Sequence, residues 1–250
     1  MTQKKVQIEG IQFCYFEITC DKPKQNILFL HGWGGSKNSL LSLGQKIGFE
    51  NDRLIWIDLP GFGESDNPNS DAGVFEYAKL VEKFCQKMEI NNNLIIVGHS
   101  FGGSIGLLLD EKLLKIQKKI LIAPAWSRNQ EKKNAGWGFL KAIFSKTRLI
   151  KRIVYKILYP KSDLFLASHL ESNFRKIIHE DLRDFIKVTE VPKLLISGSL
   201  DTYVPLEKTK ELSDLLGSSA SFKDVGKYGH SLPLTQVDLI APIISNFLQS

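Results

Sequence analysis

The six residues GHSFGG at positions 98–103 separate the apolar run NLIIV from SIGLLLD, which has the composition of a helix. A strand, a glycine-rich turn and a helix in this order are the context of the G-x-S-x-G elbow, where a strained turn exposes a serine hydroxyl. Glycine at 98 and 102 would keep side chains out of the tight contacts around such a turn. The stretch makes Ser100 a candidate nucleophile, and a simple glycine-rich bend is the alternative.

Short apolar runs, each about the length of a strand, lie on both sides of this stretch. They are NILFLHG, LIWIDLPG, LIIVGHS, KILIAPA and KLLISGS, and helix-like segments separate them at residues 39–47, 75–88, 103–114 and 206–216. This alternation predicts a doubly wound α/β fold, with a mostly parallel sheet covered by helices on both faces. Before the first run, the alternating segment at residues 4–18 predicts a β-hairpin.

One long interval, at residues 126–187, interrupts the alternation and contains no clear strand. Apolar residues near a 3.6-residue period predict helices at 136–159 and 172–188 within it. We therefore expect an α/β core formed by residues 1–125 and 188–250, with residues 126–187 inserted as a helical cap, or lid.

Length and composition are those of one soluble domain with an insertion, at 250 residues and 43% hydrophobic residues. Three cysteines without C-x-x-C spacing favour free thiols in a reducing compartment. The first ten residues lack the apolar core of a signal peptide, so we expect a cytoplasmic protein. We expect no stable membrane insertion, although a basic amphipathic helix of the cap could lie on a membrane surface.

The net charge of +6 is concentrated in the cap. Residues 126–187 hold 14 Lys and Arg against 6 Asp and Glu, a net charge of +8, while the remainder holds 19 against 21, a net charge of −2. No zinc-finger or RNA-binding signature accompanies this charge, so we expect no nucleic-acid partner. The cap surface is either a solvated lysine-rich face or a patch for an acidic partner or substrate.

A serine nucleophile needs a base to take its proton. His230, in KYGHSLPL, lies in a glycine-flanked loop after the strand-like run SFKDVG, from which it could reach the serine. Of the other four histidines, His31 is assigned to turn structure, and the side chain of His99 is expected to diverge from that of Ser100. His169 and His179 are assigned to the solvated surface of the cap.

The base in turn needs an acid to hold its tautomer. Asp201, in LLISGSLDTYVP, follows a buried-type strand at its carboxyl end, where open α/β sheets place their sites. It gives the chain order Ser, Asp, His that this elbow usually has. A plain turn aspartate is the alternative reading, and Asp224 and Asp238 are weaker candidates for the acid.

Acyl transfer also needs N–H donors for the oxyanion. The backbone N–H of Phe101, directly after the serine, is one expected donor. The loop LFLHGWGGS offers the other at Trp33, where three glycines allow close approach of the backbone and the indole could wall an acyl pocket.

Taken together, HGWGG, DLPGFGES, GHSFGG, GSLDTYVP and the later GH resemble the α/β-hydrolase fold superfamily over nearly the whole chain. The resemblance implies an eight-stranded, mostly parallel sheet with a helical cap after the sixth strand. It matches Ser100, Asp201 and His230 to the nucleophile, acid and base, and Trp33 and Phe101 to the oxyanion donors. DLPGFGES matches a structural loop, so Asp58 and Glu64 are not counted as catalytic.

Within the superfamily, HGWG and the basic cap are similar to small carboxylesterases, including the methyl esterase of biotin synthesis. We expect a serine esterase for small to medium apolar acyl groups, with no metal or organic cofactor, and aromatic cap residues around the pocket: Trp126, Trp137, Phe139 and Phe144. An acyl carrier protein is a candidate partner at the basic cap. A carbon–carbon bond hydrolase, an acyltransferase and an inactive binding module are the alternatives.

Overall fold

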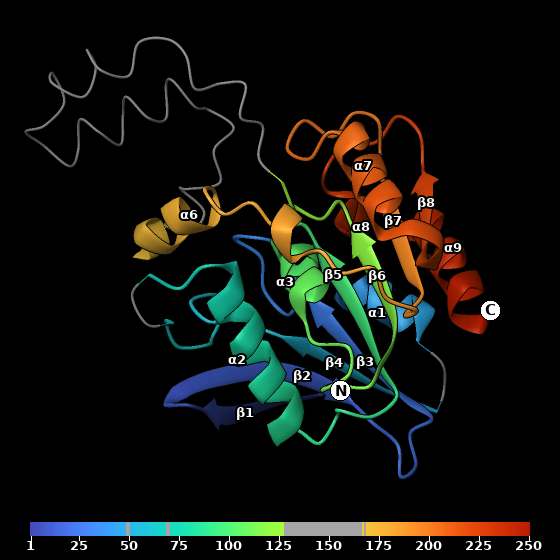
Figure 1. The fold of residues 1–250 in the computed structure, drawn as a ribbon. Helices are drawn as coiled ribbons and strands as arrows, with labels where there is room; N and C mark the ends of the chain where they lie inside the picture. The colour runs from blue at the N-terminus through green and yellow to red at the C-terminus, as the bar shows by residue number, and fades with distance from the viewer. Residues whose placement is uncertain (49–50, 69–70, 128–166, 168) are drawn as a thin grey trace, which may run out of the picture.

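The computed structural model describes residues 1–48, 51–68, 71–127, 167 and 169–250. Eight strands form one sheet in the order β1-β2-β4-β3-β5-β6-β7-β8 (Figure 1). The pairs β1–β2 and β2–β4 are antiparallel and all others are parallel, which confirms the predicted fold class. The strands are β1 Thr2–Ile8, β2 Ile11–Ile18, β3 Gln25–Leu30, β4 Asp52–Ile57, β5 Leu94–His99, β6 Ile116–Ile122, β7 Lys193–Ser197 and β8 Ala220–Asp224.

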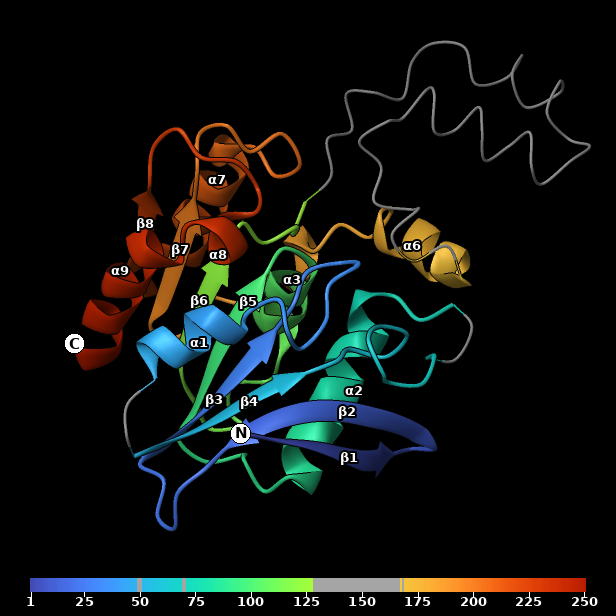
Figure 2. The ribbon, with the colours of Figure 1, turned by 180° about the vertical axis from the view of Figure 1, so that it is seen from behind.

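Helices cover both faces of this sheet, and each face has its own hydrophobic core. Helices α2, α3 and α7 pack on one face, and α1, α8 and α9 pack on the other, which is the face seen in Figure 2. The helices are α1 Leu41–Ile47, α2 Val74–Lys87, α3 Phe101–Leu108, α6 Glu171–Ile177, α7 Leu206–Leu216, α8 Leu232–Thr235 and α9 Val237–Gln249, with 3₁₀ turns at Arg183–Phe185 and Gly217–Ser219.

The central strand β5 shows why the runs are apolar at every position. Leu94 and Ile96 point into the core under α2 and α3, while Ile95 and Val97 point into the core under α1 and α9. Each of these side chains is at most 2% exposed. Burying a side chain of this size contributes roughly 1.5–3 kcal/mol. The strand that ends at the elbow is therefore held firmly on both faces.

Helix boundaries depart from expectation at two places. The helix expected at 103–114 begins at Phe101 and ends at Leu108, after which the Asp110 carboxylate accepts the N–H groups of Lys112 and Leu113 and forms a turn. Of the helix expected at 172–188, only α6 and the short turn Arg183–Phe185 form. Between them, the Leu182 N–H donates to Trp126 O, a tertiary bond that replaces a helical one. The helix expected at 136–159 lies outside the described residues.

Residues 167 and 169–187, at the C-terminal end of the expected cap, are attached to the core beside the N-terminus of α2. Asn173 donates to Ala72 O, and the Glu180 carboxylate accepts the N–H of Val74 at 2.6 Å. Residues 167 and 169–187 hold four basic and four acidic residues, so the excess positive charge belongs to residues 128–166, which hold 10 Lys and Arg against 2 Asp and Glu.

Cys14 and Cys85 are buried, and all three cysteines are free thiols. Across the described ranges, no helix combines the length and apolar character needed to cross a bilayer.

Candidate active site

Ser100 occupies a sharp turn between β5 and α3, with φ 52° and ψ −112°. A non-glycine residue in this region is strained, and the strain is tolerated only where surrounding contacts enforce it. Here the Ser100 N–H donates to Ile122 O at 2.9 Å. The backbone also packs closely around this turn. A Cβ at Gly98 would lie 2.5 Å from Gly102 O, and one at Gly102 would lie 2.1 Å from Leu30 O. The glycines of the motif are thus required by packing.

His230 lies on the loop between β8 and α8, and its ring bridges two side chains. Its Nε2 is 2.9 Å from Ser100 Oγ, and its Nδ1 is 2.7 Å from Asp201 Oδ2. Since a carboxylate only accepts, Nδ1 carries the proton, and Nε2 is left to accept the serine hydroxyl. Asp201 and His230, which follow Ser100 by 101 and 130 positions, thus complete one hydrogen-bonded chain with it.

Asp201 follows β7 at the carboxyl edge of the sheet, and its side chain is fully buried. Its Oδ1 accepts the N–H groups of Tyr203 and Val204, both at 2.9 Å, while Oδ2 accepts from His230. Both oxygens therefore have fixed donors, and the carboxylate cannot rotate. The weaker candidates lie elsewhere, because Asp224 accepts the N–H of Gly226 and Asp238 pairs with Lys46.

The two backbone N–H groups predicted to bind an oxyanion are those of Phe101 and Trp33. That of Phe101 is the first of α3, whose positive dipole end faces the elbow. That of Trp33 comes from the loop after β3, the strand that pairs with β5. Counting only acceptors among the described residues, neither N–H has a hydrogen-bond partner. Both are therefore available as donors.

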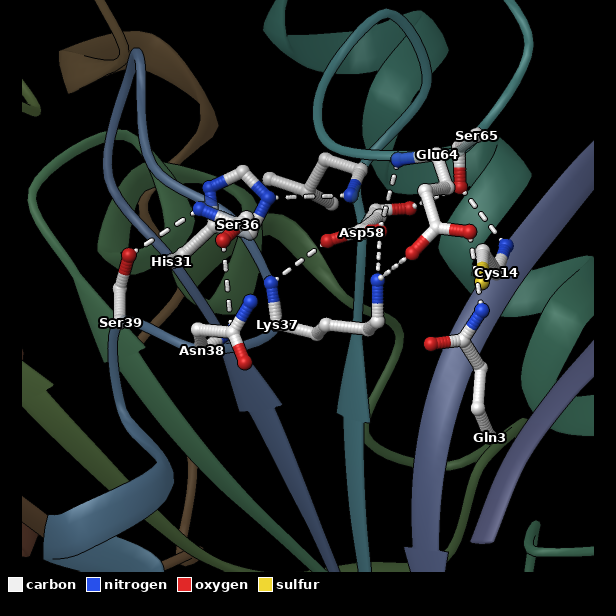
Figure 3. A network of polar contacts seen from close by, with 11 residues as sticks. Gln3, Cys14, His31, Ser36, Lys37, Asn38, Ser39, Asp58, Glu64 and Ser65 are labelled. Carbon is white, nitrogen blue, oxygen red and sulfur yellow. Dashed lines mark hydrogen bonds and ion pairs between the residues drawn. The ribbon is translucent and has the colours of Figure 1, made fainter.

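The loop that carries Trp33 is anchored to the loop after β4 by a buried ion pair (Figure 3). Lys37 Nζ lies 2.8 Å from Asp58 Oδ2 and 2.9 Å from Glu64 Oε1, and the Lys37 N–H donates to Asp58 Oδ1 at 2.6 Å. Burial lowers the pKa of the Lys37 ammonium, but its hydrogen bonds to these two carboxylates and the Coulomb attraction of Asp58 together outweigh this and raise the pKa. Lys37 therefore stays charged and holds the two loops together.

His31, directly after β3, is a second link between the loop after β3 and the loop after β4 (Figure 3). Its Nδ1–H donates to Gly32 O at 2.7 Å, and its Nε2 accepts the N–H of Leu59 at 3.1 Å. The ring is 1% exposed. His31 thus has the turn-forming surroundings expected from the sequence, and Trp33 lies between two anchors.

Aromatic side chains pack around Trp33. Its ring lies 4.9 Å from that of Phe62, 5.5 Å from that of Phe101 and 5.1 Å from that of Phe174 on α6. Sequence reasoning missed Phe174, since nothing in SNFRKII says which core residue its helix faces. Trp33 and Phe174 are both partly exposed, as surface for an apolar ligand must be.

The four aromatic residues predicted for the pocket fare differently. Trp126 is fully buried in the hydrophobic core, and its indole N–H donates to Lys208 O at 2.8 Å. A side chain with these surroundings packs rather than offering surface to a substrate, so Trp126 is left out of the acyl pocket proposed below. Trp137, Phe139 and Phe144 lie outside the described residues.

Two buried histidines make stability depend on pH. Burial lowers the pKa of His31 from 6.5 to about 4 and that of His99 to about 3. Between pH 6.5 and these values the unfolded chain binds protons that the folded chain does not, so the free energy of unfolding falls as pH falls. Between pH 7.5 and pH 5 we expect each histidine to lower the free energy of unfolding by about 2 kcal/mol. Urea unfolding at the two pH values measures this loss.

Comparing variants separates this effect from the titration of carboxylates. His31→Gln should lose less stability than the wild type over the same pH interval, by about 2 kcal/mol. His179→Gln, which changes an exposed histidine, should keep the wild-type loss. Equal losses in all three proteins would contradict the assignment of neutral His31.

Comparison with known proteins finds similarity along the chain. A profile of the family described as alpha/beta hydrolase fold matches residues 25–145. The uncharacterized hydrolase YugF of Bacillus subtilis strain 168 is 23% identical over 98% of this chain and 97% of its own length. A pimeloyl-[acyl-carrier protein] methyl ester esterase of Hamiltonella defensa is 24% identical over 80% of this chain and 83% of its own. A solved meta-cleavage product hydrolase from Pseudomonas fluorescens IP01 has a TM-score of 0.71 at 22% identity, covering 98% of this chain and 97% of that one.

Proposed function

Because the chain belongs to the α/β-hydrolase fold superfamily, we propose that it is a serine hydrolase that cleaves carboxylic esters through an acyl-enzyme intermediate. The observation that carries the proposal is the hydrogen-bonded chain from Ser100 Oγ through the His230 ring to the Asp201 carboxylate, with links of 2.9 and 2.7 Å. A nucleophile bonded to a base, which an acid orients, is the arrangement that acyl transfer needs.

The reaction follows from this geometry. Ser100 Oγ attacks the ester carbonyl while His230 Nε2 takes its proton, and Asp201 stabilises the imidazolium. The N–H groups of Trp33 and Phe101 bind the oxyanion of the tetrahedral intermediate. His230 then gives the proton to the departing alcohol, and a water molecule repeats the sequence on the acyl-enzyme. These steps use only residues of this chain.

An apolar acyl group of small to medium size is the substrate class that we propose. Trp33, whose N–H would bind the oxyanion, packs against Phe101, and Phe174 lies beside it; the rings of Trp33 and Phe174 are partly exposed. Trp137, Phe139 and Phe144 remain proposed members of the same pocket from the sequence. A curated relative at 24% identity is named a methyl ester esterase, which supports an ester over other acyl donors.

A fluorophosphonate probe and a panel of p-nitrophenyl esters test the proposal. We expect the probe to modify Ser100, as mapped by mass spectrometry, and turnover to peak at an intermediate acyl chain length. Equal turnover of acetyl and octanoyl esters would contradict the pocket. A folded protein that neither reacts with the probe nor cleaves any ester would favour an inactive binding module.

Two other reactions use the same three residues. A carbon–carbon bond hydrolase would leave the ester panel nearly untouched and yet react with the probe at Ser100. An acyltransferase would cleave esters faster when an alcohol or amine acceptor is added and would form the acylated acceptor. Product analysis by mass spectrometry distinguishes both from an esterase.

We propose further that the ester is presented on an acidic acyl carrier protein. The net charge of +8 at residues 126–187 supports this, as does the carrier-linked substrate named for the Hamiltonella relative. With an ester-loaded carrier as substrate, charge reversal at Lys151 and Arg152 should lower kcat/KM about 10-fold and weaken its salt dependence. The kcat/KM for a free ester is the control and should not change. Equal losses with both substrates would contradict the proposal.

A further inference from the structure

His99 is the last residue of β5 and directly precedes Ser100, the proposed nucleophile. It also contacts the loop that carries His230, the proposed base. Its ring is 6% exposed, and its Nε2–H donates to the main-chain oxygen of His230 at 2.9 Å. The two imidazole rings lie 4.9 Å apart, centre to centre. One strand end thus carries Ser100 and also binds the main chain of the residue that would activate it.

The base loop has few other anchors near this point. Leu200 N–H donates to Tyr228 O at 3.0 Å, and the Ser231 carbonyl accepts the N–H groups of Leu234 and Thr235. Between these anchors, and within the part of the chain that the structure describes, the bond from His99 is the only hydrogen bond to the main chain of His230. The position of the His230 ring depends on the position of the His230 main chain. The bond from His99 therefore helps to fix the distance between His230 Nε2 and Ser100 Oγ.

The ring of His99 also lies against the oxyanion loop. A Cβ placed on Gly32 would be 3.1 Å from His99 Nδ1 and 3.3 Å from Ser100 Cβ, so a side chain there would crowd both residues. Asp201 and His31 are the other titratable groups close enough to affect the ring. Burial keeps His99 neutral, with a pKa of about 3, so it adds no positive charge beside His230 when that residue takes a proton.

We propose that His99 is a positioning residue, which holds the main chain of His230 on the end of β5 and so sets the contact between base and nucleophile. The inference rests on the function proposed above. Its physical basis is that displacing a catalytic group by about 1 Å lowers turnover by up to about 100-fold.

Three variants test the proposal. His99→Leu introduces an apolar side chain of similar size and removes the hydrogen-bond donor. His99→Gln instead keeps an N–H near the position of Nε2. Val97→Ala, two residues earlier on the same buried strand, is a control for general loss of stability. We expect His99→Leu to lower kcat about 10- to 100-fold with KM within about 3-fold, and His99→Gln to keep most of the wild-type kcat.

A second measurement does not depend on turnover. The proton shared by His230 Nδ1 and Asp201 should give a strongly downfield proton NMR signal, and His99→Leu should broaden or shift it while Val97→Ala leaves it in place. A signal unchanged in His99→Leu, or a kcat no lower than that of Val97→Ala, would overturn the proposal. If even the wild type lacks esterase activity and probe labelling, the proposed function fails, and the NMR comparison still decides the role of His99.

Discussion

Replacing Ser100 by alanine should lower kcat by about 10⁴- to 10⁶-fold and leave the fold intact. The loss is large because Ser100 Oγ is the hydroxyl that His230 Nε2 contacts, and variants lacking the nucleophile in this type of site lose rate on that scale. The Tm should change by no more than about 4 °C, since only one hydrogen bond is lost. Steady-state kinetics on the best ester of the panel measures the first quantity, and thermal unfolding measures the second.

Ser104, one turn further along α3, provides the matched control. Its hydroxyl is buried and donates to Ala125 O at 2.8 Å, with a longer contact to the main-chain oxygen of Ser100 at 3.3 Å, and it does not contact the Ser100 hydroxyl. Ser104→Ala should keep kcat within about 3-fold of the wild type and still react with the fluorophosphonate at Ser100. Activity retained in Ser100→Ala, or lost equally in both variants, would rule out Ser100 as the nucleophile.

Replacing Asp201 by asparagine should lower kcat about 10⁴-fold with little change in KM. The structure predicts how the amide would lie. Two backbone N–H groups, those of Tyr203 and Val204, point at Oδ1, so the amide oxygen must take that place and the NH₂ group must face His230. Nδ1 then accepts instead of donating, and the proton moves to Nε2. A ring protonated there cannot take the proton of Ser100.

Asp224→Asn is the control for this variant, because Asp224 ends the strand next to β7 and its carboxylate accepts the nearby Gly226 N–H rather than binding His230. Its kcat should stay within about 3-fold of the wild type. A loss below about 10-fold in Asp201→Asn would show that the carboxylate does not orient the base, even though the two side chains are in contact.

Much of the candidate site could be predicted because it depends on local geometry and on strand order. A serine flanked by glycines after a buried strand can adopt the elbow only if the backbone passes close to β3. Parallel strands end at the same edge of the sheet, so Asp201 after β7 and a loop after β8 could be expected near Ser100. The structure brings these side chains into contact.

Residues that act through distant contacts could not be predicted in this way. Lys37, in GSKNS, has the sequence surroundings of a surface lysine, yet only 3% of its side chain is exposed because Asp58 and Glu64 neutralise it. The sequence predicts only that the side chains of His99 and Ser100 diverge. It does not predict that the His99 ring reaches a carbonyl 131 residues away. No local pattern encodes contacts between residues so far apart.

The start of α3 shows a different limit. The sequence pattern predicts a helix from residue 103, but α3 begins at Phe101, so Gly102 and Gly103 both lie inside it, although glycine costs roughly 1 kcal/mol in a helix interior. Glycine is needed at 102 despite this cost, because a Cβ there would lie 2.1 Å from Leu30 O. Tertiary packing therefore overrides the local preference at the point where the nucleophile needs a helix N-terminus behind it.

The order in which the site residues occur along the chain has a consequence for protein synthesis. The strand and loop of Trp33, the elbow and β6 are all made before residue 123, whereas Asp201 and His230 follow Ser100 by 101 and 130 residues. At typical translation rates, the ribosome needs roughly 6 to 26 seconds to cover the second interval. During that time the nascent chain holds Ser100 and the proposed oxyanion donors but not His230, the proposed base. The proposed activity therefore cannot arise until nearly the whole chain has been made.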